Sequence, residues 1–136
     1  MSISGLNHYT IRCVPDDLPT LVAFYTKYVG LVAGERPTMP HPGYWLYANG
    51  HPIVHLYASL TEKAAGSTGP LDHVSFRAHG LAEIRSFLQA DGTSFDEFPL
   101  PGTSINQIFL RDPNGLKIEL TFDMNEEVAH GNAQRS

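Results

Sequence analysis

The residues with the clearest capacity for chemistry recur at matching places in the two halves of the chain. His8 lies in the segment LNHYTIR, and His73 lies in the similar segment LDHVSFR, at positions 65 apart. Near the end of each half, NGHPIVHL resembles NGLKIEL, which matches His55 with Glu119 at positions 64 apart. Two matches at nearly one offset indicate an internal repeat. The repeat pairs a histidine with a histidine, and a histidine with a carboxylate.

Imidazole and carboxylate groups in this combination suit a divalent metal ion. Two histidines and one carboxylate with open positions form the arrangement favoured by non-haem Fe(II), and they also suit Mn(II). A third histidine gives a four-ligand site able to hold Zn, Ni, Co or Fe. The chain has no short ligand motif such as HxH or HExxH, so the hypothesis depends on the repeat. It predicts one shared metal site built from His8, His55, His73 and Glu119.

Hydrophobic periodicity predicts the elements that position these residues. Polar and apolar side chains alternate over residues 8–13, as in a half-buried strand. Apolar residues at helical spacing predict a helix over 18–29, and the second half repeats it over 81–90. The predicted strands are residues 8–13, 30–35, 44–49 and 52–58 in the first half, and 71–78, 94–100, 106–112 and 115–122 in the second.

Each half therefore has the order βαβββ, and the fold class is α+β. The apolar sides of the strands can pack on the helices, so we expect a cupped mixed sheet with its helices on the outer face and polar groups facing a cleft. The whole chain, residues 1–136, is predicted to form one domain of two tandem modules. The modules cover about residues 5–62 and 70–123, and residues 124–136 form a polar tail with at most a short helix.

Composition excludes several other classes of protein. The net charge is −5, which argues against a nucleic-acid partner because binding phosphates needs a basic surface. Cys13 is the single cysteine, so a disulfide within the chain and a cysteine-rich zinc site are both excluded. The longest clearly apolar run, residues 21–25, is far too short to cross a membrane. No secretory signal is visible at the N-terminus, and a cytoplasmic location is expected.

The segments LNHYTIR, FYTKYVGL, LDHVSFRA and FLRDPNGLKIEL resemble the vicinal oxygen chelate superfamily over about residues 5–123. That superfamily includes glyoxalase I, fosfomycin-resistance enzymes, methylmalonyl-CoA epimerase, extradiol dioxygenases and bleomycin-resistance proteins. The resemblance implies metal positions at His8, His73 and Glu119. It places His55 where glyoxalase I and the epimerase have Glu or Gln. His55 then either binds the metal or acts as a base, since imidazole titrates near neutral pH.

Three functions are compatible with this resemblance. The first is a metal-dependent lyase or isomerase that chelates vicinal oxygens of a small substrate and moves a proton, with Glu119 and His55 as candidate bases. The second is an extradiol dioxygenase that binds a catechol on Fe(II) held by His8, His73 and Glu119, with His55 or Tyr57 as acid or base. The third is a metal-free ligand-binding protein of the bleomycin-resistance kind. Such relatives generally lack the metal residues, so the first two functions are favoured.

Further residues are candidates for holding the substrate: Tyr44, Trp45, Tyr47, Arg12 and Arg77. The three aromatic rings can cover a flat substrate, although packing in the core or in a dimer interface is the simpler role for each. Arg12 follows His8 by four residues, and Arg77 follows His73 by four. This is about 13 Å along a strand, at ~3.3 Å per residue. They are therefore expected to reach an anionic end of the substrate, or a surface ion pair, and not the metal. The resemblance also implies a homodimer, with each site built within one chain or across two.

Overall fold

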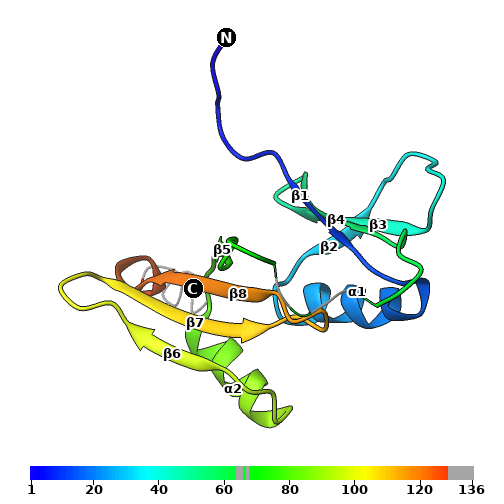
Figure 1. Ribbon diagram of the computed structural model, residues 1–136. Helices are drawn as coiled ribbons and strands as arrows, with labels where there is room; N and C mark the ends of the chain where they lie inside the picture. The colour runs from blue at the N-terminus through cyan, green and yellow to red at the C-terminus, as the bar shows by residue number, and fades with distance from the viewer. Residues whose placement is uncertain (64–65, 67, 129–136) are drawn as a thin grey trace. The chain divides into compact units, whose positions relative to one another are not determined.

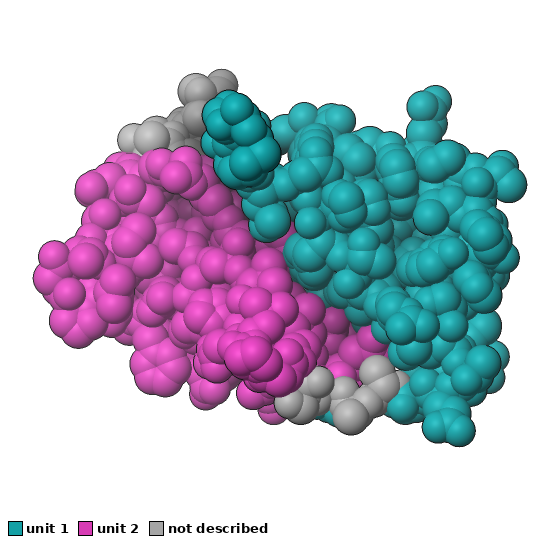
Figure 2. All heavy atoms as spheres, turned by 45° about the horizontal axis from the view of Figure 1, so that its top comes forward, with its two compact units in different colours: residues 1–66 teal, residues 67–136 magenta. Residues whose placement is uncertain are grey.

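The structure is a computed structural model that describes residues 1–63, 66 and 68–128. The chain divides into two compact units, residues 1–66 and residues 67–136 (Figure 2). Each unit is described by itself. Of the helices in these ranges, none has the length and apolar character needed to cross a membrane.

Unit 1 consists of one four-stranded mixed sheet and its helices. Its elements are β1 (Tyr9–Arg12), the 3₁₀ helix η1 (Pro15–Asp17), α1 (Leu18–Lys27), β2 (Val32–Gly34), β3 (Gly43–Ala48) and β4 (His51–Tyr57). The strand order is β1-β4-β3-β2 (Figure 1). β1 runs parallel to β4, and the other pairs are antiparallel.

The core of unit 1 lies between this sheet and α1, which packs against β3 and β4. Val54 and Leu56 of β4 are buried, as are Leu21 and Tyr25 of α1. Because side chains alternate along a strand, His55 lies on the opposite face of the sheet from Val54 and Leu56. Because the core covers the face with Val54 and Leu56, the other face of the sheet carries His55.

Unit 2 repeats the same connectivity. Its elements are β5 (Val74–Arg77), α2 (Leu81–Ala90), β6 (Asp96–Pro99), β7 (Ile105–Arg111) and β8 (Lys117–Asp123). The strand order is β5-β8-β7-β6, with β5 parallel to β8 (Figure 1). Ile118 and Leu120 of β8 are buried. Arg85 on α2 forms two hydrogen bonds with Glu97 on β6, at 2.9 and 3.0 Å, and so ties this helix to the sheet.

The predicted fold class and tandem βαβββ order are confirmed, with differences at the ends of elements. Each module has its own four-stranded sheet. The helix predicted over 18–29 ends at Lys27, shortly before Gly30, whose φ of 75° is typical of a helix end. His8 and His73 each lie one residue before a strand, because the parallel pairing starts at Tyr9 and Val74. Cys13, which directly follows β1, is buried.

The beginning of the polar tail is attached to α2. Residues 124–128 are helical. The Glu127 carboxylate accepts hydrogen bonds from the backbone N–H groups of Gly80 and Leu81, at 2.9 to 3.0 Å. No side chain within α2 caps its N-terminus, so Glu127 satisfies donors that the helix leaves unpaired. Residues 129–136 of the predicted tail lie outside the described residues.

Candidate functional site

The strand register places the four candidate ligands at equivalent points of the two units. In unit 1, the parallel pairing of β1 with β4 puts Thr10 beside His55. In unit 2, the pairing of β5 with β8 puts Ser75 beside Glu119. His8 lies two residues before Thr10, and His73 lies two residues before Ser75. Because side chains alternate along a strand, each histidine lies on the same side of the chain as that residue. Each unit therefore carries one pair of candidates on one sheet face.

In unit 1, three rings form a continuous stack. The His8 and His55 rings are stacked with centroids 3.9 Å apart and an angle of 14° between their planes. Trp45, the β3 neighbour of His55 in the register, stacks on His55 at 4.2 Å and 8°. The imidazole of His55 is thus held between two other rings.

This stacking bears directly on metal binding. Imidazole binds a metal through a nitrogen lone pair in the plane of its ring, at about 2.0–2.1 Å for zinc. Two nearly parallel rings 3.9 Å apart cannot both have the same ion in their planes at that distance. As the rings lie here, His8 and His55 can supply one ligand to an ion, and not two.

The hydrogen bonds of these two histidines differ. Nδ1 of His8 lies 2.7 Å from the side-chain oxygen of Asn7, which leaves Nε2 available. Nε2 of His55 lies 3.2 Å from the Pro52 carbonyl, which leaves Nδ1 available. Burial lowers the pKa of His55, and the charges of His8 and Arg36 add to this effect. His55 is therefore a neutral base at pH 7.

In unit 2, Glu119 is a buried carboxylate with hydrogen bonds to both oxygens. Oε1 accepts a bond of 2.5 Å from Nε2 of Gln107, and Oε2 accepts one of 2.8 Å from the Thr121 hydroxyl. Burial by itself raises the pKa of this carboxyl, but the net pKa lies below its ordinary value. Hydrogen bonds from Ser75, Thr121 and Gln107 and the charge of His73 outweigh the burial. Glu119 is therefore ionised at pH 7.

His73 is oriented by a neighbouring carboxylate. Its Nδ1 lies 2.7 Å from Oδ2 of Asp72, and Nζ of Lys117 lies 3.5 Å from the same oxygen. Hydrogen bonding to His73 and the charge of Lys117 hold the pKa of Asp72 below its ordinary value. A carboxylate on Nδ1 leaves Nε2 as the free ligand atom, which is the usual arrangement for a metal-binding histidine.

The donor groups fit a divalent ion, although each unit holds only two of the four. Among the described residues, no three His, Cys, Asp or Glu side chains are gathered into one metal-binding group. His8 and His73 both have Nδ1 engaged and Nε2 free. Glu119 adds an ionised oxygen donor. Nitrogen and oxygen donors of these types suit Fe, Mn, Ni, Co and Zn.

The predicted aromatic residues do not share one face. Trp45 belongs to the ring stack, and the Tyr47 hydroxyl donates a hydrogen bond of 2.6 Å to the Glu35 carbonyl. Tyr44 immediately precedes Trp45 in β3 and therefore lies on the opposite face. Tyr44 therefore does not lie beside the Trp45 ring on that face, and its part in substrate binding stays a prediction. Tyr57 lies on the His55 face of β4, with its ring 5.3 Å from that of His41.

The two predicted arginines lie away from the candidate ligands. Nε of Arg12 donates a hydrogen bond of 2.8 Å to the Ser59 hydroxyl. Arg77 pairs with Thr121 in the register, and its charge acts on Asp123. Their location at the far ends of β1 and β5 agrees with the separation expected from strand geometry.

Sequence reasoning missed Arg36, which lies in the segment after β2. Its guanidinium lies over the ring of Tyr57, with Cζ 5.9 Å from the centroid, and it donates a hydrogen bond of 2.8 Å to the His41 carbonyl. Gln107 and Ser75, which surround Glu119, were also missed. Ser75 and Thr121 alternate with apolar residues in the sequence, which indicates the polar side of a strand. No sequence signal indicates Arg36, because only the fold of residues 35–42 brings it to β4.

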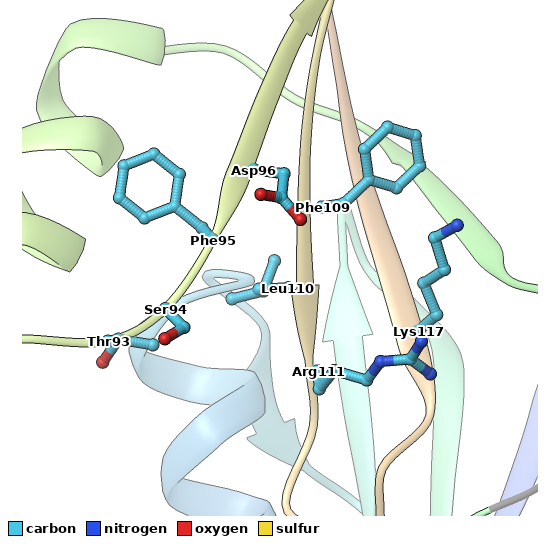
Figure 3. Close-up of a pocket in the computed structure, with 8 residues that line it drawn as sticks. All are labelled: Thr93, Ser94, Phe95, Asp96, Phe109, Leu110, Arg111 and Lys117. Carbon is cyan, nitrogen blue, oxygen red and sulfur yellow. The ribbon is translucent and has the colours of Figure 1, made fainter.

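Unit 2 has a pocket of about 540 Å³ beside β6, β7 and β8 (Figure 3). Phe109, Arg111 and Lys117 are among its lining residues. Both cations already have partners: Arg111 donates to the Gly115 carbonyl at 3.0 Å, and Lys117 lies beside Asp72 and 4.8 Å from the Phe109 ring centroid. This pocket therefore has little unpaired charge with which to select a ligand.

Comparison with known proteins identifies the family. The model of the Glyoxalase/Bleomycin resistance protein/Dioxygenase superfamily matches residues 5–120. The chain belongs to this superfamily. The match confirms the resemblance seen in the repeat segments and covers both units.

The chain is also similar to a curated protein, and it shares its fold with solved structures. The chain is 29% identical over 126 residues to "Glyoxylase I 4" of Arabidopsis thaliana, covering 88% of this chain and 71% of that protein. A putative glyoxalase family protein from Bacillus anthracis shares the fold with a TM-score of 0.72 and 18% identity, covering 90% of this chain and 98% of that one. TnmS3, an antibiotic binding protein from Streptomyces sp. CB03234, matches with a TM-score of 0.68, 20% identity and the same coverage.

Proposed function

We propose that this protein is a divalent-metal-dependent enzyme of the glyoxalase type, which moves a proton on a small substrate bearing vicinal oxygens. The observation that carries the proposal is the state of Glu119. A buried carboxylate that three polar side chains keep ionised is costly to fold, and it is the form that a metal ion requires. It stands in the superfamily position of a ligand, on the same sheet face as His73.

In this proposal, His8, His73 and Glu119 hold the ion. When bound, such an ion acts as a Lewis acid that polarises the substrate oxygens. Asp72 and Asn7 orient the two histidines so that Nε2 is the ligand atom of each. Which divalent metal is bound is determined by the metal analysis described below.

His55 is assigned the role of base and not of ligand. It is neutral, its Nδ1 is free, and its ring is fixed between those of His8 and Trp45. A neutral imidazole that is held in one orientation can accept a proton at Nδ1 and return it. Trp45 and Tyr57 share its face and can line the path of the substrate.

A second candidate is an extradiol dioxygenase that uses Fe(II) on the same three ligands. The flat indole of Trp45, stacked in line with His55, favours a planar substrate such as a catechol. A metal-free binding protein is the third candidate, since the fold is shared with an antibiotic binding protein.

Metal analysis of protein purified without chelator separates these functions. We expect about one Fe, Mn, Ni, Co or Zn ion per chain, or uptake of one after reconstitution, with loss of binding in His73→Ala and Glu119→Gln. His79→Ala is the matched control, since this exposed histidine lies 3.8 Å from Glu126 and outside the site. No binding in any form, or full binding by His73→Ala, overturns the proposal. Oxygen uptake with catechols selects the dioxygenase, and proton exchange on a hemithioacetal or hydroxyketone selects the lyase or isomerase.

We also propose that the protein acts as a cytoplasmic homodimer, in line with the family. Mixing His8→Ala and His73→Ala chains tests how the sites are built. If one site takes a module from each chain, the mixed dimer contains one intact site and recovers metal binding. If each site lies within one chain, the mixture recovers none. A monomeric mass in light scattering contradicts the dimer.

A further inference from the structure

Arg36 lies against the sheet of unit 1 at Gly43, where the sheet has no side chain. A Cβ atom at Gly43 would come within 2.9 Å of Nη2 of Arg36 and within 2.1 Å of the Leu56 carbonyl oxygen. The guanidinium therefore occupies the space above Gly43, beside Tyr57, which pairs with Gly43 in the register. It lies on the same face as His55 and Trp45.

The charge of this guanidinium is not compensated. Its Nη2 donates to the His41 carbonyl, while its Nε is buried without a hydrogen-bond partner. Within the described part of the chain, no carboxylate forms an ion pair with it. A buried polar atom without a partner is unusual in a folded protein and calls for an explanation.

Arg36 also lines a pocket of about 450 Å³ with Trp45, Tyr47, Glu35 and Pro37. This volume is in the range of small-molecule sites. One face of Trp45 is covered by His55, so the remainder of the indole bounds the pocket.

Tyr47 is fixed at the side of this pocket. A Cβ at Gly34 would lie 2.7 Å from its ring, so the ring packs directly over the glycine. Its hydroxyl is tied to the Glu35 carbonyl at 2.6 Å. The pocket thus has two aromatic walls, one of them anchored, and a single unpaired cation.

We propose that this pocket binds the planar, singly anionic part of a ligand, namely an aromatic carboxylate. The ring lies against Trp45 and Tyr47, and the carboxylate accepts hydrogen bonds from Arg36. Besides the one cation, the lining residues include one carboxylate, that of Glu35, which forms no ion pair with Arg36, so a monoanion fits better than a polyphosphate. All the residues that line this pocket belong to unit 1, and the proposed binding does not require a metal ion. If the proposed function also holds, it places an aryl carboxylate next to His55.

The test uses the full chain with EDTA present, with 1-naphthoate as the probe and 1-naphthalenemethanol as its neutral analogue. Trp45 is the only tryptophan, so the single indole N–H signal in a ¹H–¹⁵N spectrum reports on this pocket. We expect naphthoate to shift that signal saturably and to bind at least about tenfold more tightly than the alcohol, as one charge-assisted hydrogen bond implies.

Variants separate charge from stacking. Arg36→Gln is expected to weaken naphthoate binding about tenfold and to leave the alcohol unchanged. Glu35→Gln should strengthen naphthoate binding, and Lys27→Gln, which removes a cation elsewhere in unit 1, should have no effect. Equal affinity of wild type and Arg36→Gln for naphthoate, equal affinity for the two probes, or no shift of the indole signal overturns the proposal. Because EDTA removes metal, each of these results is independent of the proposed metal site.

Discussion

The imidazole rings of His8 and His55 lie face to face, with their centroids 3.9 Å apart. His55 is held on its other side by Trp45, whereas His8 precedes β1 and is exposed. Of the two rings, His8 is therefore the more exposed one, and Asn7 holds its Nδ1. The resemblance places His55 where glyoxalase I and the epimerase have Glu or Gln, and in this structure the ring at that position is held between the rings of His8 and Trp45.

The link between Asp72 and His73 predicts a specific effect on metal affinity. Asp72→Asn removes the carboxylate that fixes Nδ1 of His73, so its free Nε2 is less well oriented and less basic. We expect the dissociation constant for Ni²⁺ or Co²⁺, measured by calorimetry, to rise about 10- to 100-fold. Asp96→Asn, which removes an exposed carboxylate from β6 in the same unit, is the control. Unchanged affinity in Asp72→Asn would show that this carboxylate does not support a ligand.

The hydrogen bonds of Asp123 predict a dependence of stability on pH. Its carboxylate accepts bonds from the Ser104 hydroxyl and the Asn125 backbone N–H, which hold its pKa below the ordinary 3.8. A carboxyl whose pKa is lower in the folded state stabilises the fold above its unfolded-state pKa. That stabilisation is lost as the pH falls through the lower, folded-state pKa. We expect Ser104→Ala to raise the pKa of Asp123, measured by carboxyl ¹³C NMR, while Thr103→Ala has less effect.

The contact between Glu127 and α2 predicts that the tail stabilises unit 2. Glu127→Ala leaves the backbone donors of Gly80 and Leu81 without a carboxylate partner, and it should lower the free energy of unfolding by about 1 kcal/mol. Glu126→Ala should change it much less, since the pair of this residue with His79 is exposed. Urea denaturation measures both. Equal effects of the two substitutions would contradict the capping role.

Two glycines of unit 1 should respond differently to alanine. At Gly43 the new Cβ meets the Leu56 carbonyl oxygen at 2.1 Å, and backbone of a neighbouring strand cannot move aside cheaply. At Gly34 it meets the Tyr47 ring at 2.7 Å, and a side chain, even one held by a hydrogen bond, shifts at lower cost than the backbone of a strand. We expect a loss of about 3 kcal/mol for Gly43→Ala and about 1 kcal/mol for Gly34→Ala in thermal or urea unfolding. The reverse order would show that the clash at Gly43 is relieved by the strands.

The sequence by itself determined the repeat, the order of the elements and the sheet face of the candidate ligands. These follow from local patterns: alternation in a strand specifies which side chains share a face, and helical spacing specifies a helix. The helix predicted over 81–90 matches α2, and the strand 115–122 closely matches β8.

Only the tertiary structure decided how these groups meet. The stack of His8, His55 and Trp45 depends on the register of three strands, and the hydrogen bonds that keep Glu119 ionised come from β5, β7 and β8. Arg36 reaches the sheet because Gly43 leaves room for it. Contacts between residues far apart in the chain depend on packing, and packing is a property of the folded chain as a whole, so no local pattern in the sequence specifies them.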